Sequence, residues 1–186
     1  MDKGRIEMLW AELIDSIGDD VERSGLKATP GRIAEMYEDV FVGYDETKLP
    51  EITVFDDMQP QGLLIDKGYF FSFCEHHILP FFGEFYFGYI CDQCYPGASK
   101  IGRTVDYFAA RLQIAERLCV QVIERIEDIV KPKGSILLMS GRHLCKEMRG
   151  IKKVHSPFEV IEARGLLLSN DEGCKDEFMA RIGSRL

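Results

Sequence analysis

The strongest constraint on the fold comes from two neighbouring runs of aromatic residues, at 69–73 and 81–90. Aromatic side chains favour strands, where they pack on a pleated and half-buried surface. Two further strand candidates lie at 135–140 and 158–168. These four runs indicate that a β-sheet forms the centre of the molecule.

Helical periodicity fills the segments before, between and after these strands. Residues 6–17 carry apolar side chains at the spacing of one helix face. A second helix is expected to begin with Thr29 as its N-cap, followed by proline, and to stop by Gly43. Residues 99–130 carry two further apolar stripes, and a short helix around Phe178 closes the chain. This order of elements predicts an α+β fold with a largely antiparallel sheet.

Length and composition favour one globular domain. The chain has 186 residues, of which 46% are hydrophobic and 29% are charged, so it can bury a sizeable core. We expect a single domain over 1–186, with an N-terminal helical region at 1–47 and a catalytic core at 69–186.

Charge and hydropathy exclude several functions. Lys and Arg number 23 and Asp and Glu number 31, which gives a formal net charge of −8. This acidic balance argues against nucleic acid and anionic membranes as partners. The most apolar stretch, 78–90, contains Glu84 and is too short to span a bilayer. The polar N-terminal segment predicts a cytoplasmic protein whose six cysteines are reduced.

Three of the four histidines lie beside cysteines, in a Cys-Glu-His-His motif and a His-Leu-Cys motif. Together, Cys74, His77 and Cys145 can offer two thiolates and an imidazole to one Zn²⁺, with a fourth position left for water. Such an ion lowers the pKa of its water from about 15.7 toward roughly 7. His76 and His143 would remain beside it as proton carriers. Chance spacing of ordinary thiols and imidazoles is the alternative.

The geometry expected for the second cluster depends on a strand. Residues 140–145 directly follow a strand candidate. Side chains of a strand alternate between its faces, so a strand that continued through this segment would project His143 and Cys145 to the same side.

The other four cysteines give weaker signals. Cys91 and Cys94 have a spacing found in metal and redox sites, but no second pair of this kind accompanies them. We therefore interpret them as ordinary reduced thiols. Cys119 lies in a helical run and fits a small core residue. Cys174 has no assigned role.

A basic helix start is the candidate anion site. Within the segment 97–103, Lys100 and Arg103 are three residues apart and project from the same side of a first helical turn. Free N–H groups, the helix dipole and two cations together favour a phosphate, whereas a solvated basic turn is the alternative. Arg149 is a candidate third cation. Glu116 could accept hydrogen bonds from the N1–H and amino groups of a purine, or be an exposed helix carboxylate.

Several motifs are shared with a known enzyme family. The N-terminal half carries Thr-Pro-Gly-Arg-Ile-Ala-Glu-Met-Tyr from residue 29, and the centre carries Cys-Glu-His-His from residue 74 and Pro-Phe-Phe-Gly from residue 80. The later half carries His-x-Cys-x-x-x-Arg-Gly from residue 143. With these motifs the chain resembles the GTP cyclohydrolase I family over nearly its whole length.

The resemblance implies a zinc enzyme that hydrolyses the imidazole ring of GTP and releases formate. The product would be 7,8-dihydroneopterin triphosphate, in the first step of folate or tetrahydrobiopterin synthesis. Cys74, His77 and Cys145 would bind zinc, while His76 and His143 would move protons. The substrate-binding residues would be Ser99, Lys100, Arg103 and Arg149 for the triphosphate, Glu116 for the guanine edge, and Glu75.

The resemblance also implies an architecture and an assembly. The fold would be the tunnelling fold (T-fold), an antiparallel sheet with two helices packed on it, here with an N-terminal helical extension. The family forms a homo-oligomer, a decamer, whose active sites lie at subunit interfaces. The expected partners are therefore copies of this chain and a purine nucleoside triphosphate.

The chain departs from the family pattern at positions that recognise the base. Ala115 stands where a glutamine helps to read the guanine, and Ala98 replaces a leucine. The Thr/Ser-rich strand expected after Arg-Gly is replaced by residues 155–165. A site that loses a hydrogen-bonding partner loses discrimination. One alternative is thus a cyclohydrolase of a modified purine nucleotide such as 8-oxo-GTP. Another is a silent pterin- or nucleotide-binding oligomer, which the retained histidines disfavour.

Overall fold

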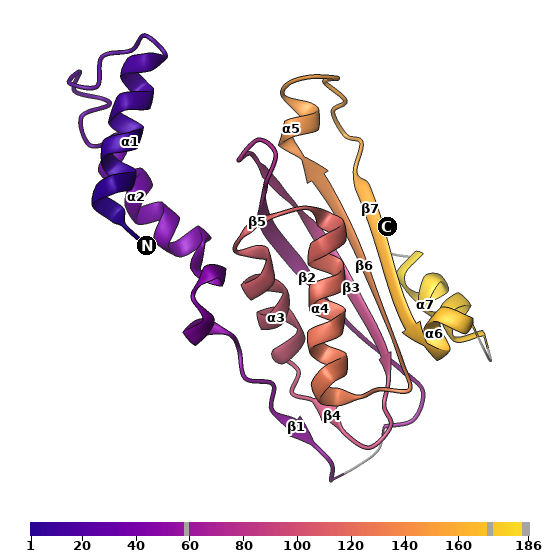
Figure 1. The fold of residues 1–186 in the computed structure, drawn as a ribbon. Coiled ribbons are helices and arrows are strands. Elements are labelled where there is room, and N and C mark those ends of the chain that lie inside the picture. The colour runs from indigo at the N-terminus through magenta and orange to yellow at the C-terminus, as the bar shows by residue number, and fades with distance from the viewer. Residues whose placement is uncertain (58–59, 171–172, 184–186) are drawn as a thin grey trace.

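The computed structural model describes residues 1–57, 60–170 and 173–183 of the chain. Its centre is a five-stranded sheet with the order β5-β2-β3-β6-β7 (Figure 1). The strands are β2 (Leu63–Cys74), β3 (Pro80–Ile90), β5 (Leu112–Gln113), β6 (Gly134–His143) and β7 (Phe158–Gly165). All neighbours pair antiparallel except β2 and β5, which pair parallel.

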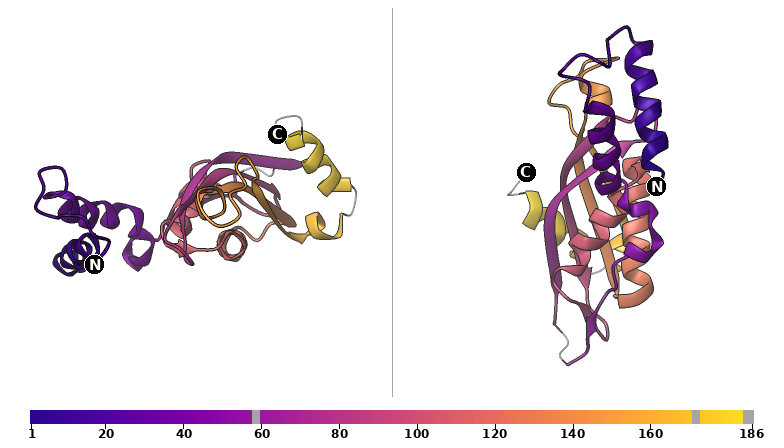
Figure 2. Two further views of the ribbon diagram at one scale, coloured as in Figure 1. Left: turned by 90° about the horizontal axis from the view of Figure 1, so that it is seen from above. Right: turned by 90° about the vertical axis from the view of Figure 1, so that its left-hand side faces the viewer.

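Two helices, α3 (Lys100–Ala109) and α4 (Ala115–Val130), cover one face of this sheet (Figures 1 and 2). Their apolar stripes meet the inward side chains of the strands, which alternate between faces. The resulting main core includes Phe70, Phe81, Phe85, Phe87, Leu118, Cys119, Ile123 and Ile126. Cys119 is fully buried, as expected of a core cysteine, and burial raises the pKa of its thiol to about 12.

The opposite face of the sheet is covered at one end by α6 (Leu166–Ser169) and α7 (Cys174–Gly183). A second core forms there around Tyr86, Ile136 and Phe178. The Phe178 ring lies against Gly88, where an added Cβ would come within 2.6 Å of it. Further along the same face, Phe71 is 72% exposed.

The N-terminal helices α1 (Lys3–Ser16) and α2 (Thr29–Val40) pack on each other and extend away from the sheet (Figures 1 and 2). Asp2 caps α1 by accepting a hydrogen bond from the Arg5 N–H. The N-cap of α2 is Ala28 rather than Thr29, whose hydroxyl instead donates to the Gly25 carbonyl. No helix among the described residues is long and apolar enough to cross a membrane.

Short elements link these layers. They are η1 (Val42–Tyr44), η2 (Glu46–Lys48), α5 (Leu144–Glu147) and the paired strands β1 (Val54–Phe55) and β4 (Tyr95–Pro96). Gly43 lies in η1, beyond the end of α2, and a Cβ there would come within 2.2 Å of the Tyr107 carbonyl oxygen. This close approach attaches the linker to α3.

The expected α+β fold with a largely antiparallel sheet is confirmed, with three local differences. β2 begins at Leu63, before the expected strand run at 69–73, because its residues pair with the far end of β3. β7 ends at Gly165, where a positive φ of 55° turns the chain into α6. The strand expected through 140–145 is wrong, since β6 stops at His143 and Cys145 lies in the helical turn α5.

The packing of α7 can be tested with two adjacent residues. Phe178→Ala should lower the free energy of unfolding by about 3–5 kcal/mol, because it empties a fully buried site. Met179→Ala removes a side chain that is 37% exposed and should cost about 1 kcal/mol or less. Urea unfolding followed by circular dichroism measures both. Equal losses would contradict the docking of α7 on the sheet.

Candidate metal centre and active site

A tight turn after β2 presents the first cluster. The Cys74 N–H donates to the Leu79 carbonyl, and the N–H groups of His77 and Ile78 donate to the Cys74 carbonyl. Ile78 adopts a positive φ of 52° to close the turn. The chain thereby reverses within a few residues, and the turn carries the Cys-Glu-His-His motif at the end of the sheet where β2 terminates.

The structure brings Cys74, His77 and Cys145 together. One donor atom from each lies within 4.8 Å of the other two, and Cys74 Sγ is 3.8 Å from His77 Nδ1. Two thiols and one imidazole form a donor set that suits Zn²⁺, and tetrahedral geometry places such donors about 3.6 Å apart. Among the described residues this is the one group of three or more metal-type side chains found close together. The spacing and donor types therefore fit a zinc ion.

The Cys145 thiol favours its protonated form when no metal ion is bound. Burial, and after it the contact with Cys74, raises the pKa of the Cys145 thiol. A metal ion reverses this preference, because it binds the thiolate and releases the proton.

His143 lies at the end of β6, between two aromatic rings. The Phe81 ring stacks on the imidazole with centroids 4.7 Å apart and planes 10° apart, while Phe158 meets it edge-on at 5.7 Å and 90°. Burial lowers the pKa of His143, so the imidazole is held neutral. Its Nδ1 lies 3.2 Å from the Gly141 carbonyl oxygen. Because a carbonyl only accepts, the proton sits on Nδ1 and leaves the lone pair on Nε2.

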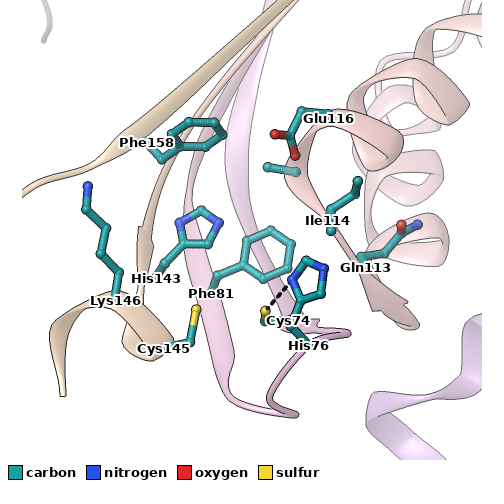
Figure 3. A pocket seen from close by; sticks show the side chains of 11 residues that line it. Cys74, His76, Phe81, Gln113, Ile114, Glu116, His143, Cys145, Lys146 and Phe158 are labelled. Carbon is teal, nitrogen blue, oxygen red and sulfur yellow. Dashed lines mark hydrogen bonds between the residues drawn. The ribbon is translucent and has the colours of Figure 1, made fainter. Parts of the chain in front are cut away.

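These side chains line one cavity of about 360 Å³ (Figure 3). Its lining consists of Cys74, His76, Phe81, Gln113, Ile114, Ala115, Glu116, His143, Cys145, Lys146 and Phe158. Glu116 reaches it from the first turn of α4. His76 Nδ1 is 3.7 Å from Cys74 Sγ, and the His76 side chain is 64% exposed. A largely apolar cavity of this size with a few convergent polar groups is typical of a small-molecule site.

Glu75 and Arg149 contact neighbours of the cluster. Both guanidinium Nη atoms of Arg117, on α4, donate to the Glu75 carboxylate and hold its pKa below its usual range. This pair ties the turn after β2 to α4. Arg149 Nη1 donates to His77 Nε2, so its charge lies beside the candidate metal ligands.

The basic helix start lies elsewhere. Ala98 and Ile101, which flank Ser99 and Lys100, line a separate small cavity with Leu64 and Asp66 near the start of β2. The eleven residues from Leu64 to Cys74 span roughly 30 Å of strand. Within one chain, Ser99, Lys100 and Arg103 are therefore far from the metal-type cluster and its cavity. Helix α3 does begin at Lys100, as its sequence predicts.

Sequence reasoning missed five residues around the cavity: Phe81, Phe158, Lys146, Gln113 and Ile114. The register of β3, β6 and β7 places the two aromatic residues beside His143, and no local pattern announces such pairings. Gln113 is buried, and its amide donates to the Phe108 carbonyl and to Gln121. A glutamine two residues before a helix has no distinctive pattern, because its burial is not visible in the sequence.

Comparisons with known proteins agree with this site. Residues 6–183 match the family described as GTP cyclohydrolase I. GTP cyclohydrolase 1 of Streptococcus sanguinis (strain SK36) is 35% identical over 184 residues, which cover 98% of this chain and 100% of the relative. The enzymes so named from Streptococcus mutans and Clostridium kluyveri are each 37% identical, over 97% and 92% of this chain and 95% and 94% of their own lengths.

The family match extends over nearly the whole chain and includes both halves of the cysteine–histidine cluster. The antiparallel sheet with α3 and α4 on one face is accordingly a T-fold. The chain belongs to the GTP cyclohydrolase I family and is a hydrolase of that type.

Proposed function

We propose that this chain is a zinc-dependent GTP cyclohydrolase that opens the imidazole ring of GTP, releases formate and yields 7,8-dihydroneopterin triphosphate. The observation that carries the proposal is the meeting of Cys74, His77 and Cys145 with His143 at one apolar cavity. Glu116 adds a carboxylate at the same cavity. This hydrolysis needs metal ligands, a neutral imidazole that can accept a proton, and a group that recognises the guanine; the cavity offers all three.

The zinc ion would be held by Cys74, His77 and Cys145, and it would supply Lewis-acid chemistry and a water nucleophile at neutral pH. The histidines take the proton transfers. His143 Nε2 carries the lone pair and can accept the proton of the attacking water as a general base. The exposed His76 can exchange protons with solvent and deliver one to the nitrogen that leaves C8.

Glu116 holds the base. Its carboxylate accepts two hydrogen bonds, which match the N1–H and the amino group of guanine. A carboxylate that finds both donors binds guanine better than a purine with an acceptor at these positions. The base would then lie with its imidazole ring toward the cluster.

The triphosphate site comes from a second chain. Ser99, Lys100 and Arg103 are too far from the cavity to reach the same nucleotide, while Arg149 already lies beside the cluster. A neighbouring copy that placed its α3 start at the cavity would complete the site. We therefore propose a cytoplasmic homo-oligomer, a decamer as in the family, with active sites at chain boundaries and without nucleic-acid partners.

A modified purine triphosphate is the second candidate substrate. Ala115 lines the cavity directly beside Glu116, where a longer side chain could have contacted the base. The missing amide removes one hydrogen-bonding partner that would select guanine, so a modified purine nucleotide such as 8-oxo-GTP is the alternative substrate. Its C8 enters at a higher oxidation level, so hydrolysis would release carbon dioxide in place of formate.

The substrate is tested with the purified, zinc-loaded protein. Incubation with GTP should release formate and one equivalent of a product that becomes fluorescent neopterin after oxidation and dephosphorylation. A parallel incubation with 8-oxo-GTP, with carbon dioxide as the readout, serves as the comparison. If the protein turns over 8-oxo-GTP faster than GTP, the 8-oxo nucleotide replaces GTP as the proposed substrate. If it turns over neither nucleotide, the cyclohydrolase proposal is refuted.

The metal site is tested by its stoichiometry. The wild-type protein should bind one zinc ion per chain, and Cys145→Ser should weaken zinc affinity about a hundredfold or more, because it removes a direct ligand. Cys174→Ser, at the start of α7 and outside the cluster, is the matched control. Zinc is measured by mass spectrometry of the metal after dialysis against a chelator. Full zinc retention in Cys145→Ser would contradict the ligand set.

Sharing of the active site is tested by mixing two defective chains. His143→Ala and Arg103→Ala should each be inactive alone. Oligomers that contain both, isolated through two different affinity tags, should regain activity at about a quarter of their sites, where an intact cavity meets an intact α3. Mixed oligomers that assemble normally and stay inactive would place both residue sets within one chain's site.

A further inference from the structure

The aromatic contacts of His143 have a role beyond filling space. We call the rings of Phe81 and Phe158 the aromatic clamp, since they contact the imidazole from two directions (Figure 3). Phe81 is fully buried and is a fixed part of the main core. Phe158 is different, because it is the first residue of the edge strand β7 and is 42% exposed.

Phe158 is held in place from the metal side of the cavity. Lys146, directly after the candidate ligand Cys145, donates from Nζ to both the carbonyl oxygen and the hydroxyl of Ser156, at 3.0 and 2.8 Å. Ser156 precedes Phe158 by two residues, with a proline between them. The start of β7 is thus anchored to α5, and the position of the Phe158 ring depends on that anchor.

The clamp restricts what the imidazole can do. A histidine ring can flip by about 180° around χ2, which exchanges Nδ1 with Cδ2 and Nε2 with Cε1 and so moves both nitrogens. Here the Phe81 ring stacks on the imidazole, the Phe158 ring lies at a right angle to it, and the Gly141 carbonyl holds Nδ1, so that rotation of the ring is restricted. Within the described part of the chain, Nε2 has no hydrogen-bond partner. The nitrogen with the lone pair is therefore kept free for a ligand in the cavity that His143 lines.

We propose that Phe158 is a positioning residue, which closes the cavity over His143 and keeps Nε2 presented to the substrate. This inference rests on the proposed function, in which His143 accepts a proton. Its physical basis is that a small misplacement of a catalytic group costs a large factor in rate. An apolar edge at this place also keeps water from competing for the imidazole.

The kinetic test compares three variants on β7. Phe158→Ala should lower kcat about tenfold to a hundredfold and leave KM within about twofold, because the ring acts through His143 and not on the bound substrate. Phe158→Tyr keeps the ring and should restore kcat to near the wild-type value. Ile161→Ala removes an apolar residue from the same strand but from the opposite face of the sheet, and is the matched control.

A raised KM with unchanged kcat would overturn the proposal, because it would make Phe158 a substrate contact. An equal loss of kcat in Ile161→Ala would also overturn it, because the effect would then be a general disturbance of β7. If Phe158→Ala fails to fold, Phe158→Leu takes its place, since it keeps apolar bulk but offers no ring edge.

A second readout needs no turnover. The chain has four histidines, so ring nitrogen resonances of zinc-loaded, ¹⁵N-histidine-labelled protein can be assigned to His143 by comparison with His143→Ala. Wild type and Phe158→Tyr should show one form, with the proton on Nδ1, and Phe158→Ala should show exchange between forms. An unchanged His143 spectrum in Phe158→Ala would refute positioning. If the wild type does not turn over GTP, the proposed function is refuted. The spectroscopic test still decides whether Phe158 positions His143, because it does not depend on turnover.

Discussion

The pairing of β3 with both of its neighbours is the interaction on which the rest of the structure depends. In this register Phe73 faces Pro80 on one side, and Phe81 faces His143 on the other. The two cysteine–histidine motifs are far apart in the sequence, and this pairing brings them together at one end of the sheet, where β2 and β6 terminate. The pairing requires Gly83, because a Cβ there would lie 1.9 Å from the Ser140 carbonyl oxygen. A side chain at this position would push β3 and β6 apart, and it would thereby move the two motifs away from each other.

The parts of the site that could be predicted from the sequence are those whose chemistry is local. The residue types of the Cys-Glu-His-His and His-Leu-Cys motifs were enough to suggest a metal, and the stripes of α3 and α4 were enough to place two helices. The position of Cys145 was not predictable, because β6 ends at His143, where its last pairing is with Phe81 of β3, and that long-range pairing leaves no local signal in the sequence. The distance from Lys100 to the cavity was equally hidden, since it depends on how far β2 extends.

The same contrast explains why the aromatic clamp was missed. A phenylalanine at the start of a strand has no distinctive spacing, and its contact with His143 joins the start of β7 to the end of the preceding strand, β6. Two of the positions at which the chain differs from the family pattern, Ala115 and Phe158 in the segment 155–165, line one cavity. The cysteine and histidine residues of the candidate metal site thus match the family pattern, whereas residues that line the cavity where a purine base would lie differ from it.

The separation of the α3 start from the cysteine–histidine cluster has a consequence for geometry on a larger scale. On the proposed division of labour, each chain gives a cavity to one substrate and cations to another. An open row of chains would then leave an unused cavity at one end and an unused cation pair at the other. A closed ring leaves neither, because a head-to-tail contact that returns to its start matches every half-site with its complement. Closure itself would then be the condition under which every chain works.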